Sequence, residues 1–93
     1  MSLTFEWDEE KARANLRKHG VSFAEAKSLF NDPFLMTFPD PEHSLAEARY
    51  VSIGLSAQGR ILVVSHTDRE MNVRLISCRK ATRTERRAYE ESR

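Results

Sequence analysis

The sequence predicts one α+β domain, in which two helices precede a run of antiparallel strands and a further helix follows them. Apolar residues recur at helical spacing up to about residue 30 and alternate at strand spacing from residue 35 to residue 78. A capping motif then opens a last helix near the C-terminus. Because 93 residues can enclose only one modest core, we expect residues 1–93 to form a single domain.

The first helix is delimited by clear signals at both ends. Thr4–Trp7 alternates as a short strand would, and Asp8 has the side chain of an N-cap. Acidic residues follow in the first turn, and the basic run at 17–19 falls in the last turn, so both complement the helix dipole. Gly20 stands where a left-handed residue would end the helix.

The second helix starts at a capping box, Ser22–Glu25, with Val21 placed to pack against Ala26. Its apolar face reaches Phe30, and the run Asn31–Pro33 stops it.

Strand-like segments follow, and each is bounded by turn residues. They are Leu35–Phe38, Arg49–Ser56, Ile61–Thr67 and Asn72–Cys78. Ala57–Arg60 joins the second and third as a hairpin, and Asp68–Met71 is the next turn. Thr82–Glu85 is a capping box for a C-terminal helix that reaches about Glu91. The result is an antiparallel sheet of about four strands.

Composition excludes several classes of protein. The chain is 40% hydrophobic and 31% charged with a formal net charge of +1, as in ordinary globular domains. Its longest apolar run, Ile61–Val64, is far shorter than the ~20 residues of a membrane helix. The first ten residues are acidic where a secretory signal would be basic, and Cys78 has no partner for an intrachain disulfide. We therefore expect a cytoplasmic protein that does not contact membranes.

Cations gather in two segments, residues 11–18 and residues 79–93. Such segments can create a local positive field on a nearly neutral molecule and attract phosphates. The alternative is that each segment is simply a solvated helix face.

Several short phrases occur in an order that is hard to obtain by chance. They are Phe5-Glu6-Trp7-Asp8, Asn15, Lys18-His19-Gly20-Val21-Ser22-Phe23, Asp32-Pro33, Glu47-Ala48-Arg49, Ile53-Gly54-Leu55-Ser56 and Ile76-Ser77-Cys78-Arg79-Lys80-Ala81-Thr82. Together they resemble the BrnT family of type II toxins over nearly the whole chain. One departure is Cys78, where the family more often has Ala.

The resemblance implies a RelE-like fold, with two N-terminal helices packed on a curved antiparallel sheet and the C-terminal helix at its edge. It also implies a metal-independent endoribonuclease that inhibits translation. The implied partner is a BrnA-like antitoxin with a ribbon-helix-helix segment, through which alone the complex would contact operator DNA.

Cleavage of RNA without a metal requires a base for the 2′-OH, a cation for the developing phosphorane and an acid for the leaving oxygen. We expect no cofactor and no metal, because the three histidines and Cys78 lie far apart without ligand spacing. There is also no glycine-rich phosphate loop.

Three residues are the predicted catalytic group. His66 lies near a strand end, and histidine exchanges protons readily near neutral pH. Arg79 closes the last strand just before a helix N-terminus, where phosphate binds well. Arg74 shares a face with Arg79 only if the strand bulges or ends before Arg79. The alternatives are a structural histidine and a salt bridge from Arg79 to an acidic residue of the last helix.

A second set is predicted to bind RNA rather than to react. It comprises Lys18, Lys80, Arg83, Arg87 and Tyr89. The basic members could equally be solvated, and a single helical tyrosine is more often part of a core. Glu47 is a minor candidate for the general base, and a structural ion pair with Arg49 is the favoured interpretation.

Two other functions remain open from the sequence. The chain could be a non-catalytic module that binds an antitoxin and acts as a co-repressor. A sequence-specific DNA binder is the weakest hypothesis, because no segment has a helix-turn-helix or zinc-finger pattern.

Overall fold

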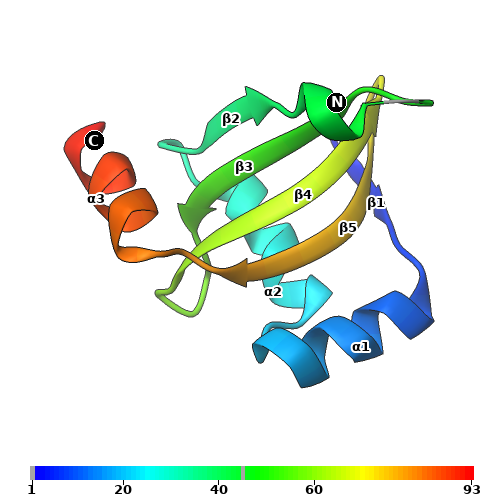
Figure 1. The fold of residues 1–93 in the computed structure, drawn as a ribbon, viewed down its shortest axis with the longest axis horizontal. Coiled ribbons are helices and arrows are strands. Elements are labelled where there is room, and N and C mark those ends of the chain that lie inside the picture. Colours follow the sequence, from blue (N-terminus) through cyan, green and yellow to red (C-terminus); the bar gives the residue numbers. More distant parts are fainter. Residues whose placement is uncertain (1, 45) are drawn as a thin grey trace.

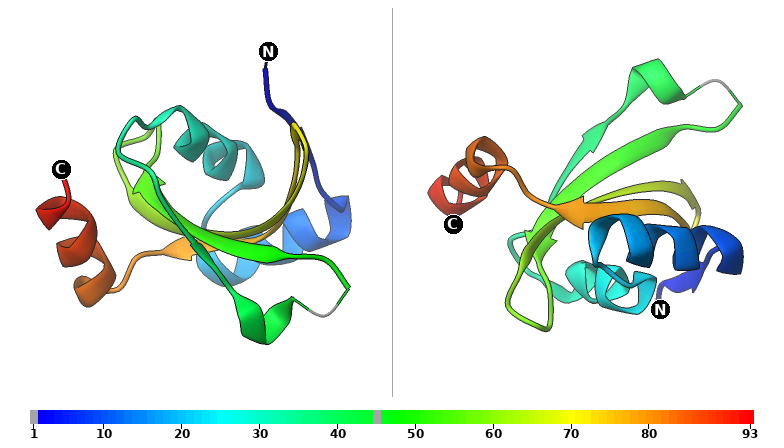
Figure 2. Two further views of the ribbon diagram at one scale, coloured as in Figure 1. Left: turned by 90° about the horizontal axis from the view of Figure 1, so that it is seen from above. Right: turned by 60° about the horizontal axis from the view of Figure 1, so that its bottom comes forward.

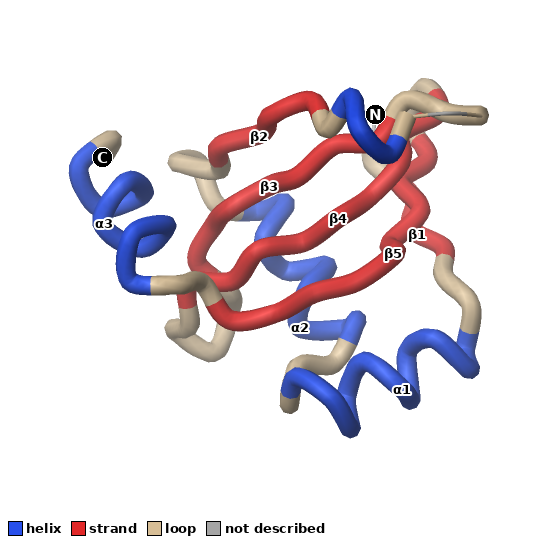
Figure 3. The backbone as a smooth tube through the Cα atoms, in the orientation of Figure 1, coloured by secondary structure: helices blue, strands red, loops and turns tan. Residues whose placement is uncertain are grey.

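The computed structural model describes residues 2–44 and 46–93. The helices are α1 (Glu9–His19), α2 (Phe23–Lys27) and α3 (Arg83–Glu91), with short 3₁₀ helices η1 (Ser28–Asn31) and η2 (Pro41–His43). The strands are β1 (Thr4–Glu6), β2 (Met36–Pro39), β3 (Arg49–Leu55), β4 (Ile61–Arg69) and β5 (Asn72–Lys80). Figures 1 and 3 show β1 followed by α1 and α2, then the strands β2 to β5, and α3 at the C-terminal end. The predicted α+β class is therefore confirmed.

The sheet differs from the prediction of about four antiparallel strands. It has five strands in the order β1-β5-β4-β3-β2, and β1 pairs with β5 in parallel, so the sheet is mixed. The other neighbours are antiparallel. Three residues suffice for β1 because it adds to an edge that the β4–β5 hairpin already provides, and the backbone N–H of Thr4 donates to the carbonyl of Met71 at 2.8 Å. The predicted turn from Asp68 is also shorter, since β4 continues to Arg69.

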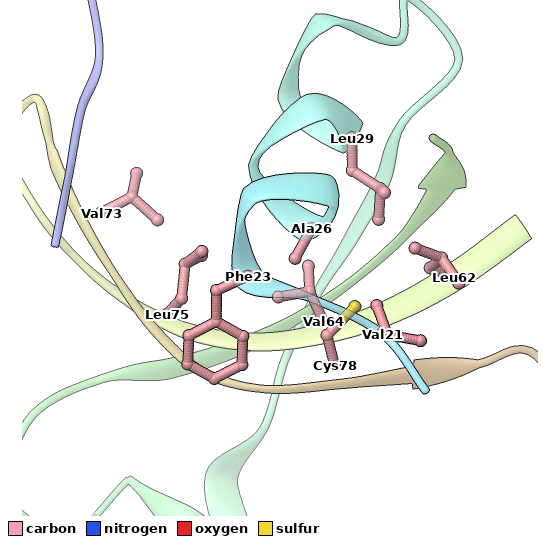
Figure 4. Close-up of a cluster of buried hydrophobic side chains, with 9 residues drawn as sticks. All are labelled: Val21, Phe23, Ala26, Leu29, Leu62, Val64, Val73, Leu75 and Cys78. Atoms are coloured by element: carbon pink, nitrogen blue, oxygen red, sulfur yellow. The ribbon is translucent and has the colours of Figure 1, made fainter. Parts of the chain in front are cut away.

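The sheet curves around α2, and the N-terminal helices lie on its concave face (Figure 2). The caps form as predicted: Asp8 accepts hydrogen bonds from two N–H groups at the start of α1, and Gly20 ends it in the left-handed region at φ 70°. A core cluster joins this face to the helices, and Figure 4 shows its buried members, among them Phe23, Val64 and Cys78. We call this side of the sheet the covered face.

Asn15 fixes α1 against the sheet where β1 no longer covers the edge of β5. Its side-chain oxygen accepts from the N–H of Cys78, and its amide donates to the carbonyl of Cys78 and to that of Val21. Asn15 is buried, so these bonds satisfy strand groups that would otherwise lack partners. The side chain of Asn15 thus supplies the hydrogen bonds that a neighbouring strand would otherwise make to Cys78.

The second helix is shorter than predicted, because α2 ends at Lys27 and the chain continues as η1. Ser22 caps it, but the other half of the predicted capping box does not form. The carboxylate of Glu25 instead accepts hydrogen bonds from Arg60 and Ser56. The Arg60 hydrogen bonds lower the pKa of this buried carboxyl group despite its burial. The pair ties α2 to the turn between β3 and β4.

The last helix packs against the other side of the sheet, at one end only. Tyr89 is 1% exposed and lies in a second core cluster with Ile53, Val63 and Ala81. Its hydroxyl donates to Asp32 on the connection before β2. Most of this side, which we call the open face, has no helix over it (Figure 2). No helix among the described residues is long and apolar enough to cross a membrane.

Candidate active site

His66 lies on the covered face and is only 1% exposed. Its Nε2 is 2.8 Å from the hydroxyl of Ser52, and its Nδ1 is 2.6 Å from the carboxylate of Asp68. The ring also packs edge-on against Phe30 and stacks with Tyr50. With both nitrogens engaged and no access to solvent, this imidazole cannot reach an RNA phosphate in this conformation. It has the features of the structural histidine that the sequence left as the alternative.

The two predicted catalytic arginines lie on the opposite, open face. The β4–β5 register shifts between Ser65 and His66, which leaves one extra residue of β5 at Ile76. Because of this bulge, Leu75 and Cys78 both point into the same core despite being three positions apart. Arg74 and Arg79 therefore both point away from that core. The strand bulge that would allow Arg74 and Arg79 to lie on the same face is therefore present.

A shared face is not a shared site. Five positions of strand separate the Cα atoms of Arg74 and Arg79 by roughly 15 Å. Their guanidinium groups bind different carboxylates, those of Glu6 and Glu85. His66 lies on the other side of the sheet from both. The structure therefore does not bring these three residues together around one point, and their joint catalytic role stays a prediction. Alternation in β4 gives the face of His66 correctly, but its burial depends on residues distant in sequence.

The Arg79 guanidinium is bound to the helix cap. It donates from Nη1 and Nη2 to the two carboxylate oxygens of Glu85 at 2.7 and 2.9 Å. The same carboxylate completes the predicted capping box by accepting from the N–H of Thr82. Hydrogen bonds from Arg79 lower the pKa of Glu85 to about 2, against the effect of burial. The salt bridge that the sequence left as an alternative is thus present.

Around Arg74 the open face is hollowed into a polar cavity of about 270 Å³. It is lined by Glu6, Glu47, Thr67, Arg69, Asn72 and Arg74. Glu6 receives a hydrogen bond from Asn72 at 2.7 Å and lies 3.6 Å from the Arg74 guanidinium. Arg69 donates from Nε to Glu47. Two carboxylates and two guanidinium groups therefore meet at the ends of four segments of chain.

A second cavity, of about 350 Å³, adjoins the first through Glu47. It is lined by Glu42, His43, Ala46, Glu47 and Arg49. His43 is exposed and forms a 3.0 Å contact with Asp40 through Nδ1. The Nε of Arg49 is buried with no hydrogen-bond partner, the one such side-chain atom among the described residues. A buried unpartnered donor next to a cavity is a feature that an anion or a water could satisfy.

We call these two adjoining cavities the Glu47 site. Its residue types match the requirements of metal-free RNA cleavage: a carboxylate or an imidazole can move protons, and guanidinium groups can hold a phosphate. Among residues 2–44 and 46–93 no three metal-ligating side chains converge. Sequence reasoning named Glu47 only as a minor candidate and did not select Arg69, His43 or Arg49. The one local signal was that these polar residues flank strand ends.

The residues predicted to bind RNA fall into separate regions. Lys80, Arg83 and Arg87 are exposed at the end of β5 and on α3. Lys18 is exposed on α1, which covers the other face of the sheet. Tyr89 is buried, and burial raises the pKa of its hydroxyl to about 12, with a further contribution from Asp32. Its ring is therefore not available to stack on a base, and that prediction was wrong.

Comparison with known proteins agrees with this fold. The chain is similar to the crystal structure of the Brucella abortus ribonuclease toxin BrnT, at 26% sequence identity and a TM-score of 0.68, over 88% of this chain and 100% of that one. No curated protein sequence matches it significantly. Residues 7–85 match the family model of BrnT, the ribonuclease toxin of type II toxin–antitoxin systems. The chain therefore belongs to the BrnT family of ribonuclease toxins.

Proposed function

We propose that the chain is a metal-independent endoribonuclease and that its reaction takes place at the Glu47 site. A base removes the proton of a ribose 2′-OH, and the oxygen attacks the adjacent phosphorus. The P–O bond to the next nucleotide breaks as an acid protonates the departing 5′ oxygen. The products are a 2′,3′-cyclic phosphate and a 5′-hydroxyl, so the step needs no redox partner and no other reactant.

The observation that carries this proposal is the position of Glu47 between two cavities, with Arg49, Arg69 and Arg74 around it. Glu47 is assigned as the base and His43 as the acid, because both line the second cavity and Glu47 also lines the first. Guanidinium groups remain charged at any relevant pH and can stabilise the dianionic phosphorane from more than one side. This assignment replaces His66 as the proton-transfer group.

The partner in this proposal is a BrnA-like antitoxin with a ribbon-helix-helix segment, since toxins of type II systems are paired with antitoxins. The pair contacts operator DNA through the antitoxin alone. The free toxin acts on RNA in the bacterial cytoplasm and thereby inhibits translation. In the alternative, the chain is a non-catalytic module that binds antitoxin and contributes to repression.

The test is cleavage of a defined single-stranded RNA by purified protein, with and without a chelator. We expect cleavage in both conditions, a cyclic-phosphate end in the product and no cleavage where the 2′-OH is replaced by hydrogen. Glu47→Gln keeps the shape of the side chain and should lower kcat by about 10²-fold to 10⁴-fold, as loss of a general base does. Loss of activity with chelator would overturn metal independence.

A matched control distinguishes a catalytic loss from a general electrostatic one. Glu42→Gln removes the same charge from the rim of the site without removing Glu47. We expect its kcat to stay within about threefold of wild type, because exposed charges act weakly at a distance. Equal losses in both variants would contradict the assignment of Glu47 as the base. No cleavage of any RNA by the wild type would favour the non-catalytic alternative.

A further inference from the structure

A third cavity, at the end of the sheet next to α3, is larger than the two that meet at Glu47. It measures about 430 Å³ and is lined by Gly59, Arg60, Ile61, Lys80, Arg86 and Glu90. It lies between the β3–β4 turn, the end of β5 and α3, which are close together at one end of the molecule in Figure 1. We call it the α3 cavity. Neither the family description nor the proposed reaction assigns it a role.

The α3 cavity carries positive charge that has no partner. Arg60 is bound through Nε and Nη2 to the buried carboxylate of Glu25, so its charge is largely compensated. Within the described part of the chain, the side chains of Lys80 and Arg86 form no ion pair, and both are exposed. Glu90 is the one carboxylate in the lining. The cavity is therefore net cationic, and Ile61 is its one large apolar lining residue.

The α3 cavity lies in line with the Glu47 site along β5. Arg74 lines the Glu47 site, and Lys80 lines the α3 cavity six positions further along the same strand. That is a span of roughly 20 Å. The β5 bulge places Arg79 on the open face between them, and Ser77 pairs with Ser65 in the stretch that no helix covers. Ser77 and Arg79 thus lie on the open face between Arg74 and the strand end, and the α3 cavity lies at that strand end, where Lys80 pairs with Leu62.

We propose that the α3 cavity binds a backbone phosphate of single-stranded RNA several nucleotides away from the cleaved bond. This inference rests on the proposed function and adds a substrate class to it. A span of roughly 20 Å corresponds to about six stacked nucleotides at 3.4 Å each. Sequence-tolerant binding of single strands commonly uses a cationic groove that follows the backbone. An acidic protein segment would bind the same charges, but it would not need the alignment with the Glu47 site.

The test compares a long and a short substrate with the same cleavage site. We use single-stranded RNAs of about 15 and about 3 nucleotides, because only the long one spans both cavities. In the double variant Lys80→Ala/Arg86→Ala, the ratio of kcat/KM for the long RNA to that for the short RNA should fall about tenfold. The matched control is Arg13→Ala/Arg17→Ala, which removes two exposed charges from α1 on the other side of the sheet. Its ratio should remain that of the wild type.

Binding of an uncleavable long RNA, with 2′-deoxyribose at the scissile position, provides a readout independent of chemistry. Releasing the one phosphate that the α3 cavity holds should reduce the slope of log K against log salt by about 0.7, the value for one phosphate of a single strand. An unchanged slope and an unchanged length ratio, in a variant with wild-type thermal unfolding, would overturn the inference. Loss of antitoxin binding with RNA binding intact would also overturn it, by making the cavity a protein surface. If the wild type cleaves nothing but the slope still falls, the cleavage proposal fails and the phosphate site stands.

Discussion

Ionisable side chains on the two faces of the sheet differ in their exposure and in their hydrogen-bond partners. On the covered face His66 is 1% exposed, and both of its ring nitrogens have protein partners. On the open face the side chains of Arg74 and Glu6 are 41% and 49% exposed, and they meet 3.6 Å apart at a cavity. A buried group whose hydrogen-bonding atoms all have protein partners contributes to stability. A half-exposed group still has hydrogen-bonding atoms that a ligand can reach. This difference is the reason for placing the proposed reaction on the open face.

Strand alternation and one bulge decide which side chains point to the covered face and which point to the open face. Residues of β4 that point inward, such as Val64, pack under α2, while their neighbours point to the open face. In β5 the extra residue at Ile76 resets the alternation, so that arginines five positions apart face the same way. Without the bulge, Arg79 would point into the core beside α1. We expect substitutions on the two faces to separate activity from stability.

Among substitutions of strand residues, Arg74→Ala should have the largest effect, and that effect is on activity. Removing a guanidinium that stabilises the phosphorane should lower kcat/KM for RNA cleavage by about 10²-fold to 10³-fold. Stability should change little, because the ion pair with Glu6 is long and exposed, and such pairs contribute roughly 0–1 kcal/mol. Cleavage rates and urea unfolding of the same preparations give both quantities.

Arg79→Ala is the matched comparison for Arg74→Ala, since it removes the same group from the same face of the same strand. Its guanidinium is already bound to Glu85, so its loss should affect stability more and the chemical step less. A larger drop in kcat for Arg79→Ala than for Arg74→Ala, in folded protein, would move the reacting phosphate away from the Glu47 site. It would restore the end of β5 as the centre of catalysis.

The next effect is on stability, from His66→Ala. The substitution leaves a cavity between Phe30 and Tyr50 and deprives the buried hydroxyl of Ser52 of one partner. We expect a loss of about 2–4 kcal/mol in the free energy of unfolding, measured in urea. At a temperature where the variant is folded, kcat should remain within about tenfold of wild type.

His66→Gln tests the same point with less damage, because an amide can still bond to Ser52 or Asp68. It should recover part of the lost stability. If both variants are stable and both lose more than about 10²-fold in kcat, His66 takes part in the reaction after all. The covered face would then have to open during turnover.

Local features of the fold could be predicted from the sequence because their causes lie within a few residues. Asp8 and Gly20 delimit α1 through hydrogen bonds and backbone angles that those residues favour wherever they occur. The box at Thr82–Glu85 forms for the same reason. Ser22–Glu25 forms only in half, because Arg60, 35 positions away from Glu25, competes for its carboxylate. Propensity cannot anticipate such a competitor.

Long-range features could not be predicted in this way. The parallel pairing of β1 depends on the edge that β5 offers, and the bulge at Ile76 depends on which side chains fill the core. The Glu47 site brings together Glu6, Arg69 and Arg74 from three strands, so no spacing in the sequence reveals it. The family resemblance was enough to predict the function. The positions of the candidate reactive groups relative to one another could be found only from the structure.

The smallest expected effect is on stability at acid pH, and it concerns the ion pair between Arg79 and Glu85 at the start of α3. Arg79 and the capping box hold the pKa of Glu85 at about 2, below its ordinary value of 4.5. A lowered folded-state pKa means that the carboxylate contributes its full stability above about pH 4.5 and loses it as the pH falls toward 2. Because Arg79 is partly exposed, we expect on the order of 1–2 kcal/mol rather than the full value of the shift. Glu85→Gln should lose that amount at pH 7 and show a shallower decline in unfolding free energy between pH 4.5 and 2.

Glu90→Gln, one turn further along α3, is the control and should keep the wild-type decline. If Glu85→Gln keeps it too, the fork between Arg79 and Glu85 does not persist in solution. Arg79 would then be free to bind phosphate, and the contrast drawn above between the two ends of β5 would weaken.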